Sequence, residues 1–498
     1  MLLSSFGGAP HKYESIVLAD PPRHPFDDSR QAAKIATQQT ILTVTPTHLG
    51  SMFAPGAIGL SIETGRLATQ DLSANHDSLA ALMRMLGPGV LRIGGNTLDY
   101  SWWTSKSEAP PEWATSVIVP SDLLTLRSLL ASTHWRTILG VDLGHFDPGR
   151  AANEAGVAER ILGSRLMGIE IGNEPNGYGI PTVKLRDSSY GVDNYLEEIS
   201  AYNAAIHVVT PRMPLYGPEL SVPNNWLTTI SSGLAAPFTT LTEHYYPTMY
   251  SVSRGPCQGT TTPTVLNLLS AQVRQQESTL FETLVGLSRV ARREARISET
   301  NTTASCDTGG GPDTSPVFAS ALWSLDWVLR AVSAGVAGIN FHGSFGVCTP
   351  VAFSPMCAPS LRAEARGQLV ARPEYYGLLA ARELEGGRFI PVDVRENTSA
   401  SLTAYATLNP QGVIRLAIDN FATEGPTSIV LHASGYRGAT DKLLTAPSLS
   451  ATSNVTFGHS TVTAVGTLRS ASKEVPRRHH LFLLKLAPAS AVIITLRR

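Results

Sequence analysis

Eight short apolar runs, separated by segments with helical periodicity, recur along the chain between about residues 56 and 386. Strands that are buried on both faces are almost continuously apolar, and their alternation with helices indicates βα units on a parallel sheet. Eight such strands are the number that closes a TIM barrel, so we predict an α/β fold built on a (β/α)8 barrel. The predicted strands are AIGLSI (57–62), VLRIGG (90–95), TILGVDLG (137–144), LMGIEIG (166–172), MPLYGPEL (213–220), TTLTEHYY (239–246), ARISET (295–300) and GVAGINFHG (335–343).

A doubly wound open sheet would show a similar alternation of strands and helices. That fold binds nucleotides at a glycine-rich turn between a strand and a helix. No predicted strand of this sequence is followed by such a glycine fingerprint and a helix. Phosphate binding therefore has little support, and the barrel is the preferred prediction.

Beyond the barrel, the pattern changes to short segments in which apolar and polar residues alternate, such as SLTAYATL, VIRLAIDN and TSIVLHA. A period of two predicts half-buried strands, and NPQG and GYRG are turn signals between them. We therefore expect a barrel domain over 47–386 and a C-terminal antiparallel β-sandwich over 387–498. The N-terminal segment 1–46 contains the strand-like run TILTVTP (40–46), which we expect to join the sandwich.

The charge balance excludes several classes of partner. With 39 basic and 40 acidic residues among 498, the formal net charge is −1, so no global field favours nucleic acid or an anionic membrane. The most apolar stretch, 480–496, is interrupted by Lys485, Pro488 and Ser490, so no membrane-spanning helix is expected. Neither C-x-x-C nor H-E-x-x-H occurs, so we expect no metal and no organic cofactor.

The cysteines bear on the compartment. Cys257, Cys306, Cys348 and Cys357 all lie in one part of the chain, and four cysteines allow three disulfide pairings. The short separation of Cys348 and Cys357 could close a small loop, and free thiols are the alternative. The N-terminus MLLSSFGGAPHKYE shows no intact signal peptide, yet disulfides would favour an exported protein, periplasmic or secreted. Nothing in the sequence indicates an oligomeric state.

Two predicted strands end in a glutamate. Asn173 and Glu174 follow the fourth strand, directly before Pro175, and Glu299 ends the seventh. Active sites of barrels lie at the carboxyl ends of the strands, where loops carry polar groups out of the packed interior. An unpaired buried carboxylate is destabilising, so two such strand ends indicate a function; a pair of structural salt bridges is the alternative.

Two carboxylates that face each other across a barrel mouth suit the hydrolysis of a glycosidic bond. One protonates the departing oxygen while the other attacks the anomeric carbon or activates water. The fourth and seventh strands lie on opposed sides of an eight-stranded ring. A separation of roughly 5 Å between the carboxyl groups, which retaining enzymes use, is therefore feasible.

An ordered set of motifs resembles the clan A glycoside hydrolases, and within them family 79, which contains the β-glucuronidases and heparanases. The resemblance spans most of the barrel, and the trailing sandwich also matches the architecture of that family. The motifs are LSIE (60–63), LRIGGNTLDYSWW (91–103), IGNEPNGYG (171–179), EHYYP (243–247), SETNT (298–302), ASALWSLDWVLRA (319–331), INFHG (339–343) and PEYYGLLAA (373–381).

The resemblance implies a retaining mechanism with Glu174 as the acid/base and Glu299 as the nucleophile. A nucleophile needs donors that keep it ionised. Arg92, at the end of the second strand, and Tyr245 or His244, at the end of the sixth, are the candidates for these donors.

Further residues are expected to contact the sugar. Asn173 precedes the acid and, by the resemblance, binds the sugar 2-hydroxyl. Glu63 and Asn96 end the first two strands and would bind other hydroxyls, with loop hydrogen bonding as the alternative. Trp103, or its neighbour Trp102, could stack on a sugar face, although core packing is the better interpretation for either one alone. His342 and Tyr246 are interpreted as wall residues without a chemical role.

The resemblance is weakest in the loops that would recognise a glucuronate carboxylate. TNTTASCDTGGGPD (300–313) contains no tyrosine, and GSFGVCTP (343–350) has Phe345 where heparanase-like sequences have one. Backbone amides from Gly309 to Gly311 could replace it, because successive amides form anion-binding nests. Cys306 and Cys348 lie in these two loops and could pin them around the pocket.

The leading prediction is a retaining, exo-acting β-glucuronidase whose substrate is a glucuronide or a glycan that contains glucuronic acid. A heparanase-like endo-glucuronidase would need a basic groove, and Lys and Arg are spread along the chain rather than clustered near the strand ends. A clan A enzyme for a neutral sugar, such as a β-xylosidase or β-glucosidase, is a second possibility. A carbohydrate-binding protein without turnover is a third, and the presence of both glutamates argues against it.

Overall fold

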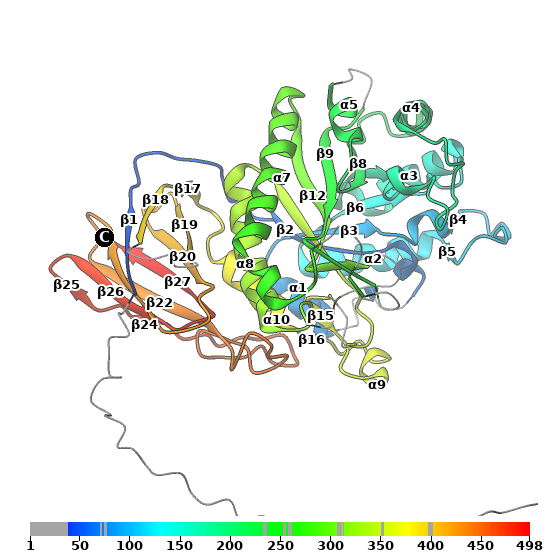
Figure 1. Ribbon diagram of the computed structural model, residues 1–498. Coiled ribbons are helices and arrows are strands. Elements are labelled where there is room, and N and C mark those ends of the chain that lie inside the picture. The colour runs from blue at the N-terminus through cyan, green and yellow to red at the C-terminus, as the bar shows by residue number, and fades with distance from the viewer. Residues whose placement is uncertain are drawn as a thin grey trace, which may run out of the picture. The chain divides into compact units, whose positions relative to one another are not determined.

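The computed structural model of the protein describes residues 38–69, 72–73, 77–232, 237–251, 255–256, 261–305, 311, 313–349, 353–396 and 402–498. Among these residues, eight parallel strands close a barrel in the order β12-β14-β2-β3-β6-β7-β8-β9, which confirms the predicted fold class (Figure 1). Each strand lies where an apolar run predicts one. Their bounds are β2 (Ile58–Glu63), β3 (Val90–Gly94), β6 (Arg136–Val141), β7 (Leu166–Ile171), β8 (Leu215–Ser221), β9 (Thr240–Tyr245), β12 (Glu294–Thr300) and β14 (Gly338–His342).

Helices and short strands connect the barrel strands. The α-helices are α1 (Asp77–Met85), α2 (Pro120–Thr133), α3 (Pro148–Leu162), α4 (Val192–Val209), α5 (Trp226–Ser232), α6 (Val265–Leu268), α7 (Ala271–Val290), α8 (Phe318–Ala334), α9 (Leu361–Glu364) and α10 (Pro373–Arg382). Turns of 3-10 helix lie at η1 (Thr64–Ala68), η3 (Leu98–Tyr100), η4 (Gly163–Arg165) and η5 (Pro175–Gly177). The short strands of the connections are β4 (Ser101–Trp103), β5 (Ser116–Ile118), β10 (Thr248–Ser251), β11 (Gly255–Pro256), β13 (Thr303–Ser305), β15 (Met356–Cys357) and β16 (Val370–Ala371).

The remaining strands form the two sheets of the sandwich, in the orders β18-β1-β21-β26-β25 and β17-β19-β20-β27-β22-β23, with β24 paired to β22. A core of buried apolar residues, among them Leu42, Ile418, Leu431 and Ile494, lies between them. The strands are β1 (Gln38–Val44), β17 (Arg388–Ile390), β18 (Val392–Glu396), β19 (Leu402–Leu408), β20 (Ile414–Asn420), β21 (Thr427–His432), β22 (Gly438–Thr445), β23 (Thr456–Phe457), β24 (Lys473–Glu474), β25 (Arg477–Arg478), β26 (Leu481–Leu486) and β27 (Ser490–Arg497).

Strand β1 comes from the N-terminal side of the barrel and completes the sandwich. It pairs antiparallel with β18 and parallel with β21, so the expected antiparallel sandwich contains one parallel pair. The whole barrel separates β1 from β21 in the chain, and a hairpin therefore does not set their relative direction.

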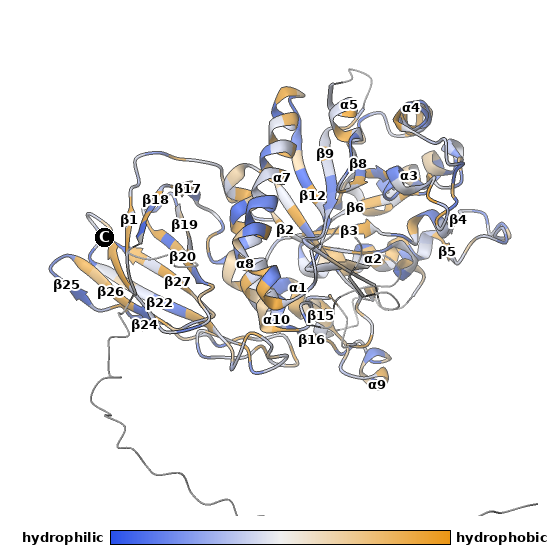
Figure 2. Cartoon of the chain, in the orientation of Figure 1, coloured by the Kyte–Doolittle hydropathy of each residue, from blue (hydrophilic) through white to orange (hydrophobic). Residues whose placement is uncertain are grey.

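Helix α8 is buried on all sides, because it packs on the barrel and also contacts the sandwich. Every residue from Phe318 to Val332 is buried, and Tyr405 of β19 donates a hydrogen bond to Asp326 Oδ1 at 2.9 Å. Figure 2 shows apolar residues concentrated along the barrel strands and hydrophilic residues on parts of the helices. No helix of the described segments is both long and apolar enough to cross a membrane.

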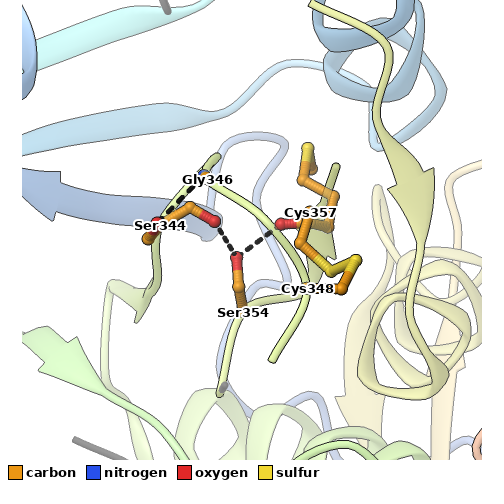
Figure 3. Close-up of a disulfide and its surroundings, with 6 residues drawn as sticks. Ser344, Gly346, Cys348, Ser354 and Cys357 are labelled. Carbon is orange, nitrogen blue, oxygen red and sulfur yellow. Dashed lines mark hydrogen bonds between the residues drawn. A yellow bond between two sulfur atoms is a disulfide. The ribbon is translucent and has the colours of Figure 1, made fainter. Parts of the chain in front are cut away.

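A disulfide joins Cys348 to Cys357 in the connection that follows β14, across nine residues of sequence (Figure 3). Ser354 donates to the carbonyl oxygens of Ser344 and Met356 at 2.8 Å and 2.5 Å, which folds the segment back on itself. Because Cys348 is bonded to Cys357, it is not bonded to Cys306. Cys257 and Cys306 lie outside the described residues.

Candidate active site

Glu174 lies just beyond the carboxyl end of β7, and its backbone conformation is unusual. Its φ angle is +52°, in the left-handed region that residues other than glycine rarely adopt, and its N–H donates to the backbone oxygen of Glu219 at 2.9 Å. Strain of this kind costs roughly 1 to 3 kcal/mol and concentrates at functional sites. The side chain is 30% exposed, and Oε1 lies 3.0 Å from His244 Nδ1. Glu174 is therefore held on one side by His244 and open to solvent on the other.

Glu299 stands at the carboxyl end of β12 and is buried. Arg92 Nη1 donates to its Oε2 at 2.6 Å, and the Tyr246 hydroxyl donates to its Oε1 at 2.7 Å. Burial opposes ionisation, but the charges of His342, His244 and Arg92 outweigh it and hold the pKa of Glu299 well below its usual range. Glu299 is therefore an anion at neutral pH.

Arg92 of β3 connects several acidic groups inside the barrel. It is fully buried, and its guanidinium also contacts Glu170 Oε1 at 2.7 Å and Glu219 Oε2 at 3.3 Å. Nη2 donates to Asn173 Oδ1 at 3.0 Å, which fixes the amide that precedes Glu174. One arginine thus orients both proposed site segments, at the ends of β7 and β12.

His244 of β9 lies between two glutamates. Nδ1 contacts Glu174 Oε1 at 3.0 Å, and Nε2 contacts Glu219 Oε2 at 2.8 Å. Burial favours the neutral ring, but the charge of Glu299 and the hydrogen bonds to Glu174 and Glu219 raise the pKa of His244 to about 10. The ring is therefore an imidazolium that donates to one carboxyl oxygen of each glutamate.

The His244 charge predicts a pH dependence of stability. A folded-state pKa of about 10, against an ordinary value of 6.5, stabilises the fold fully below pH 6.5 and loses that contribution as the pH rises toward 10. We expect His244→Gln to lower the free energy of unfolding at pH 6, and the deficit to shrink steadily between pH 6.5 and 10. Urea unfolding at a series of pH values measures this difference. His432→Gln, at an exposed position of β21, is the control and should show no such trend.

Glu63 and His342 form the opposite wall of the site. Glu63 Oε2 accepts hydrogen bonds from the backbone N–H and the hydroxyl of Thr97, both at 2.7 Å. His342 lies 3.5 Å from Glu63 through Nε2 and 3.5 Å from Glu299 through Nδ1. A side chain at Gly95 would come within 2.6 Å of the Glu63 carboxyl, so glycine there makes room for this arrangement.

The structure brings most of the predicted site residues together. Asn173 Nδ2 donates to Asn96 Oδ1 at 3.2 Å, and Asn96 is exposed. The buried Asn173 therefore connects Arg92 to an accessible amide beside Glu63. Six predicted residues share this carboxyl-end cluster, namely Glu63, Arg92, Asn96, Asn173, Glu174 and Glu299.

Two predicted residues have other surroundings. The Tyr245 ring stacks on Trp327 of α8 at 5.4 Å, because successive side chains of β9 point to opposite faces of the strand. Trp103 is buried and donates to Asn153 Oδ1 at 2.8 Å, so it packs into the wall. Trp102 packs edge-on against Trp113 and lies beneath the Arg150 guanidinium. Both tryptophans fit the packing interpretation better than sugar stacking.

Sequence reasoning missed Tyr246, His342 and Glu219. The first two were interpreted as wall residues, yet they contact the Glu299 carboxylate directly. Glu219 lies near the carboxyl end of the buried strand β8, and the pattern that singled out Glu174 and Glu299 was also available for it. Burial would raise the pKa of Glu219, but the hydrogen bond from His244 and the Arg92 charge lower it to about 2.

Ligand-type atoms of Glu174, His244 and Glu299 lie within 4.8 Å of one another, which is close enough for a shared metal ion. Metal binding requires a neutral imidazole with a free lone pair. Both His244 nitrogens instead hydrogen-bond glutamate oxygens in this structure. The cluster therefore fits acid/base chemistry better than a metal centre.

The loops predicted to recognise a carboxylate are only partly described. Gly309 and Gly310 lie outside the described residues, while Gly311 accepts backbone hydrogen bonds from Thr314 and Ser315. In the loop after β14, Phe345 is buried, and Ser344 accepts a hydrogen bond from Arg66 Nη2 at 3.0 Å. The Arg66 cation therefore lies beside this loop, at Ser344, which is two residues beyond His342 in the sequence.

No model of a protein family matches the sequence, and no curated protein matches it either. Among solved structures, a 4-O-α-L-rhamnosyl-β-D-glucuronidase from Fusarium oxysporum is 18% identical, with a TM-score of 0.75 over 92% of this chain and 100% of its own. An α-L-arabinofuranosidase from Thermotoga maritima is 14% identical, with a TM-score of 0.66 over 92% and 99%. A family 44 endoglucanase from Clostridium thermocellum is 11% identical, with a TM-score of 0.57 over 92% and 100%. The chain therefore shares the fold of these three glycoside hydrolases.

Proposed function

We propose that the protein is a retaining glycoside hydrolase. The observation that carries this proposal is the pair Glu174 and Glu299, which project from β7 and β12 with a carboxylate oxygen of each within 4.8 Å of the other. Retaining enzymes hold their two carboxyl groups about 5 to 5.5 Å apart, whereas inverting enzymes leave about 6.5 to 9.5 Å for a water molecule. The two carboxylates thus approach closely, as double displacement through a covalent glycosyl-enzyme requires.

Glu299 is the nucleophile in this proposal. Arg92 and Tyr246 each hydrogen-bond one of its oxygens, which keeps it ionised and aims it at the anomeric carbon. Glu174 is the acid/base, because it is the more exposed of the two and an aglycone or water can reach it. It protonates the departing oxygen in the first step and deprotonates water in the second.

Asn173, Asn96 and Glu63 bind the sugar in the −1 position. Asn173 is fixed by Arg92, and its amide also reaches the exposed Asn96. Glu63 accepts from Thr97 through Oε2, and its Oε1 faces His342 at 3.5 Å. Hydrogen bonds to the sugar hydroxyls that strengthen at the transition state supply several kcal/mol in glycosidases.

A β-glucuronide is the proposed substrate, with exo action. The motif resemblance to family 79 supports it, and so does the likeness of the fold to that of a rhamnosyl-glucuronidase. Arg66 beside the loop after β14 supplies a cation where the resemblance places the sugar carboxylate. Arg66 would then bind the sugar carboxylate in place of the tyrosine that this loop lacks.

A panel of p-nitrophenyl β-glucuronide, β-glucoside and β-xyloside tests the substrate. We expect release of p-nitrophenol from the glucuronide, and a rise in KM of about tenfold or more for Arg66→Gln, because a charge-assisted hydrogen bond contributes roughly 1.5 to 3 kcal/mol. Arg160→Gln, at an exposed position of α3, is the matched control and should leave KM unchanged. Preference for the glucoside or xyloside would refute the glucuronide and leave the two-glutamate mechanism intact.

A glycosidase for a neutral sugar is the second candidate. The absence of a tyrosine from 343–349 favours it, and so does the likeness of the fold to that of an arabinofuranosidase. In that case Arg66→Gln would leave the KM for the preferred glycoside unchanged.

We also propose that the protein works in an oxidising compartment, either the periplasm or the extracellular space. The disulfide between Cys348 and Cys357 supports this proposal, because such bonds persist mainly outside the reducing cytosol. Fractionation of the producing cells, followed by thiol labelling of the recovered protein, tests it. Recovery from the cytosol with both thiols free would refute it.

A further inference from the structure

A cavity lies at the opposite end of the barrel from the proposed active site. It has a volume of about 340 Å³ and is lined by residues at or near the beginnings of the barrel strands. Val90, Arg136, Thr240 and Glu294 are the first residues of β3, β6, β9 and β12. Glu174 and Glu299 lie at the other ends of their strands, so the two sites are separated by the packed interior of the barrel.

Arg296 of β12 points into this cavity without a full set of partners. Its side chain is 4% exposed, and Nε donates to Asn340 Oδ1 at 2.7 Å. Nη2 is buried and has no hydrogen-bond partner in the described part of the chain. No carboxylate of the described residues lies within 4.0 Å of the guanidinium. Among the described residues, the main cation of the cavity therefore has no carboxylate in direct contact, and Glu294 of the lining lies farther than 4.0 Å away.

Arg296 contrasts with Arg92, the other buried arginine of the barrel interior. Arg92 has three carboxylates within 3.3 Å. Burial lowers the pKa of Arg296 to about 10, so it is still charged at neutral pH. A buried charge without a close ion pair is unfavourable, so an anion bound beside Arg296 would stabilise the structure.

The surroundings of Arg296 leave room for an anion and favour it. Gly338 packs against the guanidinium, since a Cβ there would lie 2.2 Å from Nη1. Arg136 lines the same cavity from an exposed position, which gives a second cation at the entrance. Glu294 is the acidic residue of the lining, so the two arginines outnumber it.

We propose that this cavity binds one small oxyanion, such as inorganic phosphate, sulfate or a short carboxylate. The planar guanidinium of Arg296 would present its free N–H groups as a fork to two oxygens, a geometry that suits carboxylate, phosphate and sulfate. Arg136 would hold the outward-facing side of the ligand. The site is independent of the glycosidic chemistry, and its occupancy stabilises the fold by linkage.

Thermal unfolding and equilibrium dialysis of the full chain test the proposal. The melting temperature is measured against phosphate, sulfate or acetate at constant ionic strength, and dialysis with radiolabelled phosphate gives the stoichiometry. We expect a saturable rise in melting temperature with at least one of the anions. We expect Arg296→Met to abolish the rise and Arg136→Gln to weaken the affinity about tenfold, as for the loss of one charge-assisted hydrogen bond.

Arg160→Gln is the control for a general loss of positive charge, and it should bind like the unmodified protein. Circular dichroism establishes that each variant is folded. If Arg296→Met does not fold, the affinity of Arg136→Gln for the anion decides. Weaker binding than that of the unmodified protein supports the proposal, and equal binding overturns it. No saturable response to any of the three anions would overturn the proposal, and so would an equal response in all variants.

Discussion

Glu299→Gln is expected to lower kcat on the preferred aryl glycoside by at least about 10⁴-fold, because an amide cannot form the covalent glycosyl-enzyme. The substitution preserves the size of the side chain, and Arg92 and Tyr246 would remain beside it. Steady-state release of p-nitrophenol measures the loss. Glu282→Gln, the same change at an exposed position of α7, should leave kcat unchanged. Residual activity of the Glu299 variant above about 1% would refute its role as the nucleophile.

Azide distinguishes the roles of the two glutamates. In a variant of the nucleophile, azide would attack the substrate directly and yield a glycosyl azide of inverted configuration. In Glu174→Gln, the glycosyl-enzyme still forms from an activated aryl glycoside, and azide would yield the product of retained configuration. NMR of the two products therefore assigns acid/base and nucleophile separately. If the Glu299 variant gave the retained product and the Glu174 variant the inverted one, the two roles would be reversed. The mechanism would still be a retaining one.

Arg92→Met is expected to be the most destabilising single change at the site. It would leave Glu170, Glu219 and Glu299 without their shared cation, and removal of one partner from a buried ion pair costs about 3 to 5 kcal/mol. The loss should be smaller at pH 5 than at pH 8, because protonation of the stranded carboxylates relieves their repulsion. Urea unfolding at both pH values measures the free energy of unfolding.

Arg296→Met is the matched control, since it removes another buried arginine from the barrel interior. That guanidinium has no carboxylate within 4.0 Å among the described residues, so its loss strands no negative charge. In buffer free of oxyanions we therefore expect Arg296→Met to destabilise the fold less than Arg92→Met does. Equal losses for the two variants would show that Arg92 acts through packing rather than through charge.

The sequence was sufficient to predict the barrel and to place Glu174 and Glu299 at the carboxyl ends of its strands. Apolar runs of strand length separated by helical segments have few alternatives to a parallel sheet, and eight of them imply closure. Glu174 and Glu299 were identified because each interrupts such a run at its carboxyl end. Both features are local in the chain, so the order of residues reveals them.

The groups around those glutamates depended on the tertiary structure. An error of one residue in the phase of a strand moves a side chain to the other face, which is why Tyr245 was predicted where Tyr246 lies. On β12 the register shifts between Ile297 and Glu299, and both Ser298 and Glu299 contact groups inside the barrel. If the side chains of β12 alternated strictly between the two faces of the strand, only one of Ser298 and Glu299 could face the barrel interior.

The sequence by itself therefore determined the fold class and the position of the two carboxylates along the strands. Only the tertiary structure decided their chemistry, because the ionisation of a buried group depends on charges that are distant in the chain. Glu299 meets Arg92, 207 residues away, and His244 joins Glu174 to Glu219. The surroundings of Arg296 at the opposite end of the barrel likewise depend on the tertiary structure, because the closed strands bury Nη2 where no described residue accepts its hydrogen bond.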